Sequence, residues 1–376
     1  MSSKQNESEE LQFTSEVSTE SEYVVKEEAA KKIALSFLKN KREKNIDAVL
    51  DIKTLLDPLK RPYMYIVQLN KGENENSFVI VSGDKRLEPI LAYGDNEFDL
   101  DHMPEQLEYW VQGYKSQVSY FRDQKEPVQP EILKEFDQKV DRIGSDQQSK
   151  KVRSEHVSPL LTTRWGQGCV FNSFLSKKED IGTGCTTNLP CERAYTGCVA
   201  TCLSQVVNYY NSMRGYDYTK LRRSYFDTDL GTLQGDEVAR LMKEVGEIMD
   251  MEYTCSVSLA YSSDVLRSHV SQALGFTSPI KAEWFYSMDI ENIISEMKGG
   301  NPLVISGKDY NNGRRAGHLW VLDGFVRYFG TQQNTTYFHF NLGWDGRSNG
   351  WYLYNDFKLG SYNFNQYVRV FYNFRK

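Results

Sequence analysis

Apolar positions in the first 125 residues predict a small domain that contains both helices and strands. They recur at helical spacing over 25–45 and 107–122, with charged residues between them, so an amphipathic helix is expected in each. Three short strand-like runs lie between, at 64–69, 77–82 and 90–93, separated by turn residues. These elements predict helices on a small antiparallel sheet over 23–125. Residues 1–22 are polar with few large apolar side chains, which predicts a disordered tail.

Between residues 126 and 156 the regular spacing of apolar residues weakens, and Pro, Gln, Asp, Ser and Lys predominate. This composition predicts a solvated, charged linker, with the basic cluster Lys150, Lys151 and Arg153 as the expected cleavage region. A plain tether between domains would have the same composition. Cleavage here would separate the two domains.

The second domain, 157–376, begins with helices and ends with strands. Helical spacing runs from 198 to about 210, over 235–246 and 263–274, and within 278–298. Strand-like runs follow at 302–306, 318–322, 337–342, 350–353 and 367–372. The expected fold class is therefore α+β, with a helical half packed on an antiparallel sheet.

One cysteine stands at the start of the first of these helices. Thr196 and Gly197 are typical of a helix start, and Cys198 falls in the first turn. Free amides and the positive dipole end favour the thiolate there, so Cys198 is a candidate nucleophile. A small buried core cysteine is the alternative, and it is the commoner role of a lone cysteine in a helix.

Three polar residues are candidates to act with that thiol. His318 begins one predicted strand and Asn341 ends the next, so neighbouring antiparallel strands would bring them together and fix the imidazole tautomer. Gln167 is a candidate oxyanion donor, although a plain polar loop residue is the simpler interpretation. A Cys on a helix facing a His and an Asn on a sheet is the arrangement that nucleophilic acyl transfer uses.

The composition argues against several classes of function. The 376 residues are 40% hydrophobic and 26% charged with a net charge of -6, which is typical of a globular protein of about two domains. There is no basic stripe, so nucleic acid is not an expected partner. No apolar run is long enough to cross a bilayer. The five histidines lack ligand spacing on one element, so neither a metal nor another cofactor is expected.

All six cysteines lie in the second domain, and their number limits the disulfides that can form. If Cys198 is a free nucleophile, at least one other thiol stays unpaired unless it bonds between chains. Cys169, Cys185 and Cys191 lie in loop sequence and could form one bridge. Cys202, one helical turn beyond Cys198, is expected to be buried and inert.

A set of short motifs carries a family resemblance. They are WGQ at 165–167 with FN at 171–172, TGCVAT at 196–201 with SQ at 204–205, AGHLWVLDG at 316–324 and NLGWDG at 341–346. These motifs, in this order, resemble those of streptopain-type cysteine peptidases, a bacterial branch of the papain-like enzymes. The run over 78–93 is similar to that family's inhibitory propeptide. The resemblance implies an inhibitory propeptide domain over 23–125 and a papain-like peptidase domain over 157–376.

The resemblance also implies roles at the site. Cys198 would be the nucleophile and His318 the general base and acid. Gln167 and the amide of Cys198 would form the oxyanion hole, with Asn341 near the histidine.

Further positions follow from the same resemblance. Trp344 would cover the contact between the histidine and the asparagine, Gly317 would lie against the substrate backbone, and Ser258 would contact the substrate. The chain departs from the family at Leu342, where a second Trp is usual, and at Val170, where the family has a Pro-Tyr-Asn run. Neither departure removes a catalytic group, but both would alter the cleft.

The expected function is a secreted cysteine endopeptidase made as a self-inhibited zymogen. It would hydrolyse peptide bonds through a thioester acyl-enzyme and be activated by proteolysis of the linker, by itself or by another protease. Its expected partners are protein or peptide substrates and its own propeptide. The polar start is what a trimmed signal or lipoprotein leader would leave, which favours a secreted, periplasmic or outer-membrane location.

Two other functions remain open. A papain-like acyltransferase or transglutaminase would use the same residues, and its product would carry an exchanged amine. A catalytically silent binding protein would keep Cys198 only for structure.

Overall fold

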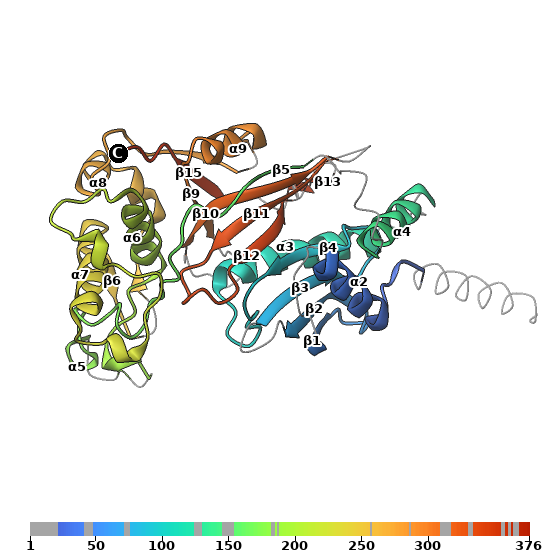
Figure 1. The fold of residues 1–376 in the computed structure, drawn as a ribbon, viewed down its shortest axis with the longest axis horizontal. Coiled ribbons are helices and arrows are strands. Elements are labelled where there is room, and N and C mark those ends of the chain that lie inside the picture. The colour runs from blue at the N-terminus through green and yellow to red at the C-terminus, as the bar shows by residue number, and fades with distance from the viewer. Residues whose placement is uncertain are drawn as a thin grey trace, which may run out of the picture. The chain divides into compact units, whose positions relative to one another are not determined.

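A computed structural model describes residues 22–40, 48–70, 76–123, 130–144, 154–181, 185, 188–255, 258–285, 287–308, 317–329, 334–354, 358–359, 362–363 and 368–376. The chain divides into two compact units (Figure 1). The amino-terminal unit takes the chain up to Phe98 and Gln112–Val152. The carboxy-terminal unit takes Asp99–Val111 and Arg153–Lys376.

The amino-terminal unit is a helix on an antiparallel sheet. Its strands pair in chain order: β1 (Ala48–Leu56), β2 (Pro62–Asn70), β3 (Asn76–Ser82) and β4 (Ile90–Gly94). Helix α2 (Glu27–Asn40) packs on β2 and β3 through buried apolar side chains at helical spacing. The expected helix and three strands are present. The strand β1 was not predicted, because its apolar and polar residues alternate only over 50–53, and Leu50 and Leu56 are about half exposed.

A helix, α4 (Pro130–Gly144), lies where we expected a linker, so that expectation is wrong over these residues. Its apolar residues recur at helical spacing, but the charged residues between them dilute the composition. The side chain of Phe136 is buried, and α4 packs on α2. The other helix of this region, α3, spans Glu105–Asp123. The predicted cleavage cluster Lys150, Lys151 and Arg153 lies outside the described residues, as does the predicted tail over 1–22 except for Glu22.

The carboxy-terminal unit contains an antiparallel sheet built around a long strand, β10 (Gly317–Tyr328). This strand pairs with β5 (Ser154–Val157), β9 (Leu303–Lys308) and β11 (Thr335–Asn341). The sheet continues through β12 (Gly350–Tyr354) on one side, and through β15 (Arg369–Tyr372) and β8 (Lys281–Trp284) on the other. The five strands predicted from the sequence are β9, β10, β11, β12 and β15.

Helices pack against this sheet (Figure 1). Helix α6 (Cys198–Tyr210) packs on β10 and on α7 (Leu233–Ile248), and it buries Val199, Leu203, Val206 and Val207. The helix expected over 263–274 is broken into a 3-10 turn, Ser262–Leu266, and α8 (Ser268–Ala273), because Arg267 has an extended ψ of 131°. The last predicted helix is α9 (Ile290–Lys298). In the part of the chain that the structure describes, no helix has the length and apolar character to span a bilayer.

Candidate active site

Cys198 is the first residue of α6, as its sequence context predicts. Gly197 precedes it with a φ of 82°, and a Cβ there would lie 2.5 Å from Cε of Met251. Glycine is therefore required at the entry to the helix. Ser258 also lies against Gly197, and its hydroxyl donates a hydrogen bond of 2.6 Å to the carbonyl oxygen of Tyr195. These contacts fix the backbone that carries the thiol.

His318 is the second residue of β10, the strand on which α6 packs. Its Nδ1 lies 3.9 Å from Sγ of Cys198. Both side chains are half-buried. The fold thus brings together a thiol and an imidazole that are 120 residues apart in the chain. Gly317 precedes His318 at the start of β10 and pairs with Lys308 of β9.

Gln167 lies in the loop that follows β5 and is buried, with 7% of its surface exposed. Its carbonyl oxygen accepts a hydrogen bond of 3.0 Å from the amide of Thr196, two residues before Cys198. No hydrogen bond joins the Gln167 side chain to another residue that the structure describes. Its amide is therefore not used within the described fold.

The Asn341 amide is buried in a hydrogen-bond network. Its Nδ2 donates to the carbonyl oxygen of Thr163 at 2.8 Å and to Oε1 of Gln205 on α6 at 3.1 Å. In the sheet, Asn341 lies opposite Val321, three residues along β10 from His318. The network joins the end of β11 to α6, whereas the expected contact with His318 stays a prediction.

The loop between β11 and β12 packs on the loop that carries Gln167. The amide of Asp345 donates to the carbonyl oxygen of Trp165 at 3.2 Å, and the Asp345 carboxylate lies against Gly166. Burial raises the pKa of that carboxyl, while the charge of Arg347 opposes the rise. The neighbouring Trp344 is half-buried, and its indole N–H lacks a hydrogen-bond partner among the described residues. Sequence reasoning missed Asp345, although it stands inside the NLGWDG motif.

Four of the six cysteines form two disulfides, Cys169–Cys191 and Cys185–Cys255. Only one bridge was anticipated, because Cys255 lies far from the other three in the chain. Cys198 and Cys202 are not disulfide-bonded. Cys202 is buried as expected, and burial, followed by the proximity of Cys198, raises the pKa of its thiol well above its ordinary value. Cys198 is the more exposed of the two free thiols.

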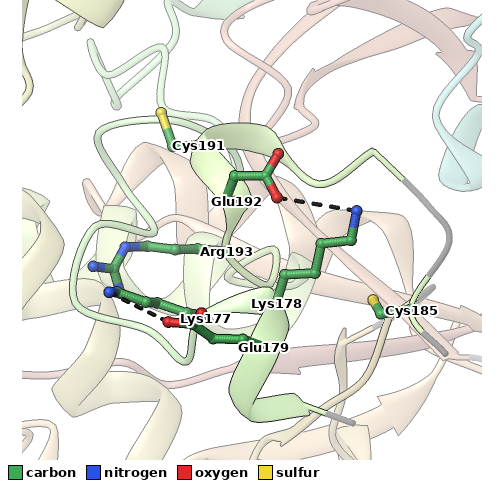
Figure 2. Close-up of a pocket in the computed structure, with 7 residues that line it drawn as sticks. All are labelled: Lys177, Lys178, Glu179, Cys185, Cys191, Glu192 and Arg193. Atoms are coloured by element: carbon green, nitrogen blue, oxygen red, sulfur yellow. Dashed lines mark ion pairs between the residues drawn. The ribbon is translucent and has the colours of Figure 1, made fainter. Parts of the chain in front are cut away.

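A charged cavity of 490 Å³ lies beside the turn that contains Cys191 (Figure 2). Its lining consists of Lys177, Lys178, Glu179, Cys185, Cys191, Glu192 and Arg193. Ion pairs join Lys177 to Glu179 at 3.5 Å and Lys178 to Glu192 at 4.0 Å. The candidate catalytic residues do not line this cavity. Across the described ranges, no group of His, Cys, Asp or Glu is arranged to hold a metal ion.

Known proteins match both units. The sequence profile of the peptidase C10 family matches residues 211–352, and that of the Spi protease inhibitor family matches residues 22–118. Streptopain from Streptococcus pyogenes is 26% identical over 343 residues, which cover 81% of this chain and 77% of streptopain. The thiol protease/hemagglutinin PrtT from Porphyromonas gingivalis is 26% identical over 328 residues. That match covers 78% of this chain but only 34% of PrtT, so the chain spans about a third of its length.

A solved structure extends the similarity to the fold. The prointerpain A fragment from Prevotella intermedia superposes with a TM-score of 0.58 at 20% identity, covering 85% of this chain and 97% of the fragment. The fold and the profile matches together define a cysteine peptidase preceded by an inhibitory propeptide domain. The chain is thus similar to the peptidase C10 family in its carboxy-terminal unit and to Spi protease inhibitors in its amino-terminal unit. The α+β fold class and the self-inhibited cysteine endopeptidase expected from the sequence are confirmed.

Proposed function

We propose that the carboxy-terminal unit hydrolyses peptide bonds with Cys198 as nucleophile and His318 as general base and acid. The observation that carries this assignment is the distance of 3.9 Å between Sγ of Cys198 and Nδ1 of His318. Helix amides and a neighbouring imidazolium both favour a thiolate at the first position of α6. A separation of this size is typical of catalytic pairs without substrate, which tighten when substrate binds.

The chemistry then follows from these groups. The Cys198 thiolate attacks the carbonyl carbon of the peptide, and the oxyanion accepts hydrogen bonds from the Gln167 side chain and the Cys198 amide. His318 donates a proton to the departing amine, which leaves a thioester on Cys198. Water then attacks the thioester as His318 accepts a proton from it, and the acid product and the thiolate are released.

Three further residues shape the site in this proposal. Gly317 has no side chain beside His318 and leaves room for the substrate main chain. The Ser258 hydroxyl is already bonded to a backbone carbonyl, so Ser258 contributes to the site as part of the surface next to Gly197. Trp344 shields the imidazole from water, and Asn341 supports the same region through its bonds to α6.

Activation and location belong to the same proposal. The Spi-type domain keeps the enzyme silent until the chain is cut near Lys150, Lys151 and Arg153, with peptide or protein substrates as the partners of the released enzyme. We place the protein outside the cytoplasm, secreted or at the bacterial surface, because two disulfides are suited to an oxidising compartment. Nucleic acid has no part in this function.

The test measures peptide hydrolysis and iodoacetamide labelling in parallel, on the activated enzyme and three variants. Cys198→Ala should lose hydrolysis and the rapid labelling, and His318→Ala should slow both. Cys202→Ala is the matched control, since it removes the other free thiol and should change neither. Hydrolysis that survives in Cys198→Ala would contradict the assignment. Amine transfer that exceeds hydrolysis when a primary amine is added would favour the acyltransferase.

A further inference from the structure

The disulfide Cys169–Cys191 lies between the two chain segments that supply the proposed oxyanion donors. Cys169 is two residues after Gln167, and Cys191 is seven residues before Cys198. We propose that this disulfide is a positioning device, which holds the Gln167 side chain at the correct place relative to the Cys198 amide. The inference rests on the proposed function, because it concerns the same hydrolytic site.

Other contacts join the same two segments. The buried Asn172 side chain donates to the carbonyl oxygens of Pro190 at 2.9 Å and Ala194 at 3.1 Å. The Thr196 amide donates to the carbonyl oxygen of Gln167 at 3.0 Å. The disulfide is thus the covalent part of a joint that starts at Gln167 and ends just before Cys198.

The backbone of this joint is strained, so it requires a constraint. Val170, Cys191 and Glu192 have φ values of 72°, 51° and 55°. Residues other than glycine rarely adopt this conformation, and it persists only where the surroundings hold it. The three positions flank or include the disulfide, so its loss would let both segments relax.

On its outer side, the turn that contains Cys191 is held only weakly by contacts other than the disulfide. There the turn borders the charged cavity, and Figure 2 shows Glu192 reaching across to Lys178. Their ion pair is 4.0 Å long and the Glu192 side chain is 75% exposed. An exposed pair of this kind holds a backbone weakly. The disulfide is therefore the strongest constraint on this face of the joint.

A loosened joint should affect one catalytic step more than another. Oxyanion stabilisation needs donors held within about 0.5 Å of their productive position. Alkylation of Cys198 by iodoacetamide develops no oxyanion on a carbonyl, so it depends on the thiolate and His318 alone. Loss of the disulfide should therefore lower kcat for peptide hydrolysis while the rate of alkylation, and its pH profile, stay unchanged.

The experiment compares two double variants of the activated enzyme. Cys169→Ser with Cys191→Ser removes the proposed positioning bridge, and Cys185→Ser with Cys255→Ser is the control. The control bridge spans 70 residues against 22, so its removal costs at least as much chain entropy. We expect kcat to fall at least about tenfold in the first variant, with alkylation within about twofold of the unmodified enzyme. The control should keep kcat within about threefold.

A double-mutant cycle with Gln167→Ala tests whether the disulfide acts through this residue. In the Gln167→Ala background, loss of the Cys169–Cys191 bridge should lower kcat by less than about twofold. A full, additive fall in that background would overturn the proposal, and so would an equal fall in the control or a parallel loss of alkylation. If the serine pair does not fold, Asn172→Ala opens the same joint and enters the same cycle. Failure of the proposed function looks different, since hydrolysis would then survive Cys198→Ala.

Discussion

Asp57→Asn in the inhibitory domain should weaken that domain strongly, because the Asp57 carboxylate is buried among four donors. Its Oδ1 accepts hydrogen bonds from the backbone amides of Leu59 at 2.9 Å and Arg61 at 2.8 Å. Its Oδ2 accepts from Nε of Arg61 at 2.7 Å and from Nη1 of Arg122 at 2.9 Å. The Arg122 side chain is only 2% exposed, so it depends on buried partners.

The expected cost follows from these contacts. Asparagine retains one oxygen for the two backbone amides but presents an NH₂ group to the two guanidinium groups. Breaking a buried ion pair by removing one partner costs about 3–5 kcal/mol. Arg122 keeps Asp84 at 3.5 Å, which places the expected loss near the lower end, at about 3 kcal/mol.

Hydrogen exchange measures this loss in the full chain that carries Cys198→Ala, which prevents self-cleavage. Amides of β2 and β3 should exchange about 100-fold faster in Asp57→Asn, since exchange in a cooperative unit follows its opening free energy. Asp51→Asn is the control, because Asp51 is exposed on β1 and should shift the free energy by less than about 0.5 kcal/mol. Equal exchange in the two variants would refute the importance of the buried pair.

The same variant has a defined pH dependence. Burial alone would raise the pKa of Asp57, but the hydrogen bonds and charge of Arg61, with the charge of Arg122, bring it below its ordinary value. A carboxyl with a lowered folded pKa stabilises fully above its unfolded pKa of about 3.9, and loses that contribution as pH falls through the folded pKa. The deficit of Asp57→Asn should therefore shrink below about pH 4. A deficit that is unchanged between neutral and strongly acid pH would contradict this reasoning.

Three further predictions concern the peptidase unit. Gly197→Ala should lower kcat/KM at least about tenfold while circular dichroism is retained, because the new Cβ would lie 2.5 Å from Cε of Met251 and displace the nucleophile. Cys202→Ala should leave kcat/KM and the labelling of the other free thiol within about twofold, since burial holds the Cys202 pKa high; a large loss would contradict its inert role. Asn341→Ala should cost about 1–3 kcal/mol in urea unfolding, because Gln205 loses a buried partner; an unchanged midpoint would contradict that network.

Much of the fold could be predicted from the sequence because its apolar residues recur at regular helical or strand spacing. The apolar face of α6 and the short apolar runs of β9 to β12 identify helix and strands directly. The same pattern places Cys198 at the start of a buried helix, and the motif around His318 supplies its partner. The observed distance between these two side chains agrees with that prediction, although their catalytic roles are tested only by experiment.

The remainder depends on tertiary contacts that a local pattern does not contain. Helix α4 was missed because charged residues dilute its apolar face. The register of β10 and β11 shifts between Leu322 and Gly324, which sets Asn341 opposite Val321. The disulfide pairing could not be predicted from the sequence either, since the partner of Cys185 is 70 residues away. A bulge and a long-range bridge are decided by the packed structure, so composition and spacing cannot determine them.

The most direct test of the central claim is an intact-mass time course of the full chain beside Cys198→Ala, under mild reducing conditions. The account predicts that the unmodified chain shortens to a product beginning between about residues 149 and 157. The variant should persist alone and be cut in the same region when a trace of active enzyme is added. Shortening of Cys198→Ala alone, at the rate of the unmodified chain, would contradict Cys198 as the peptidase nucleophile.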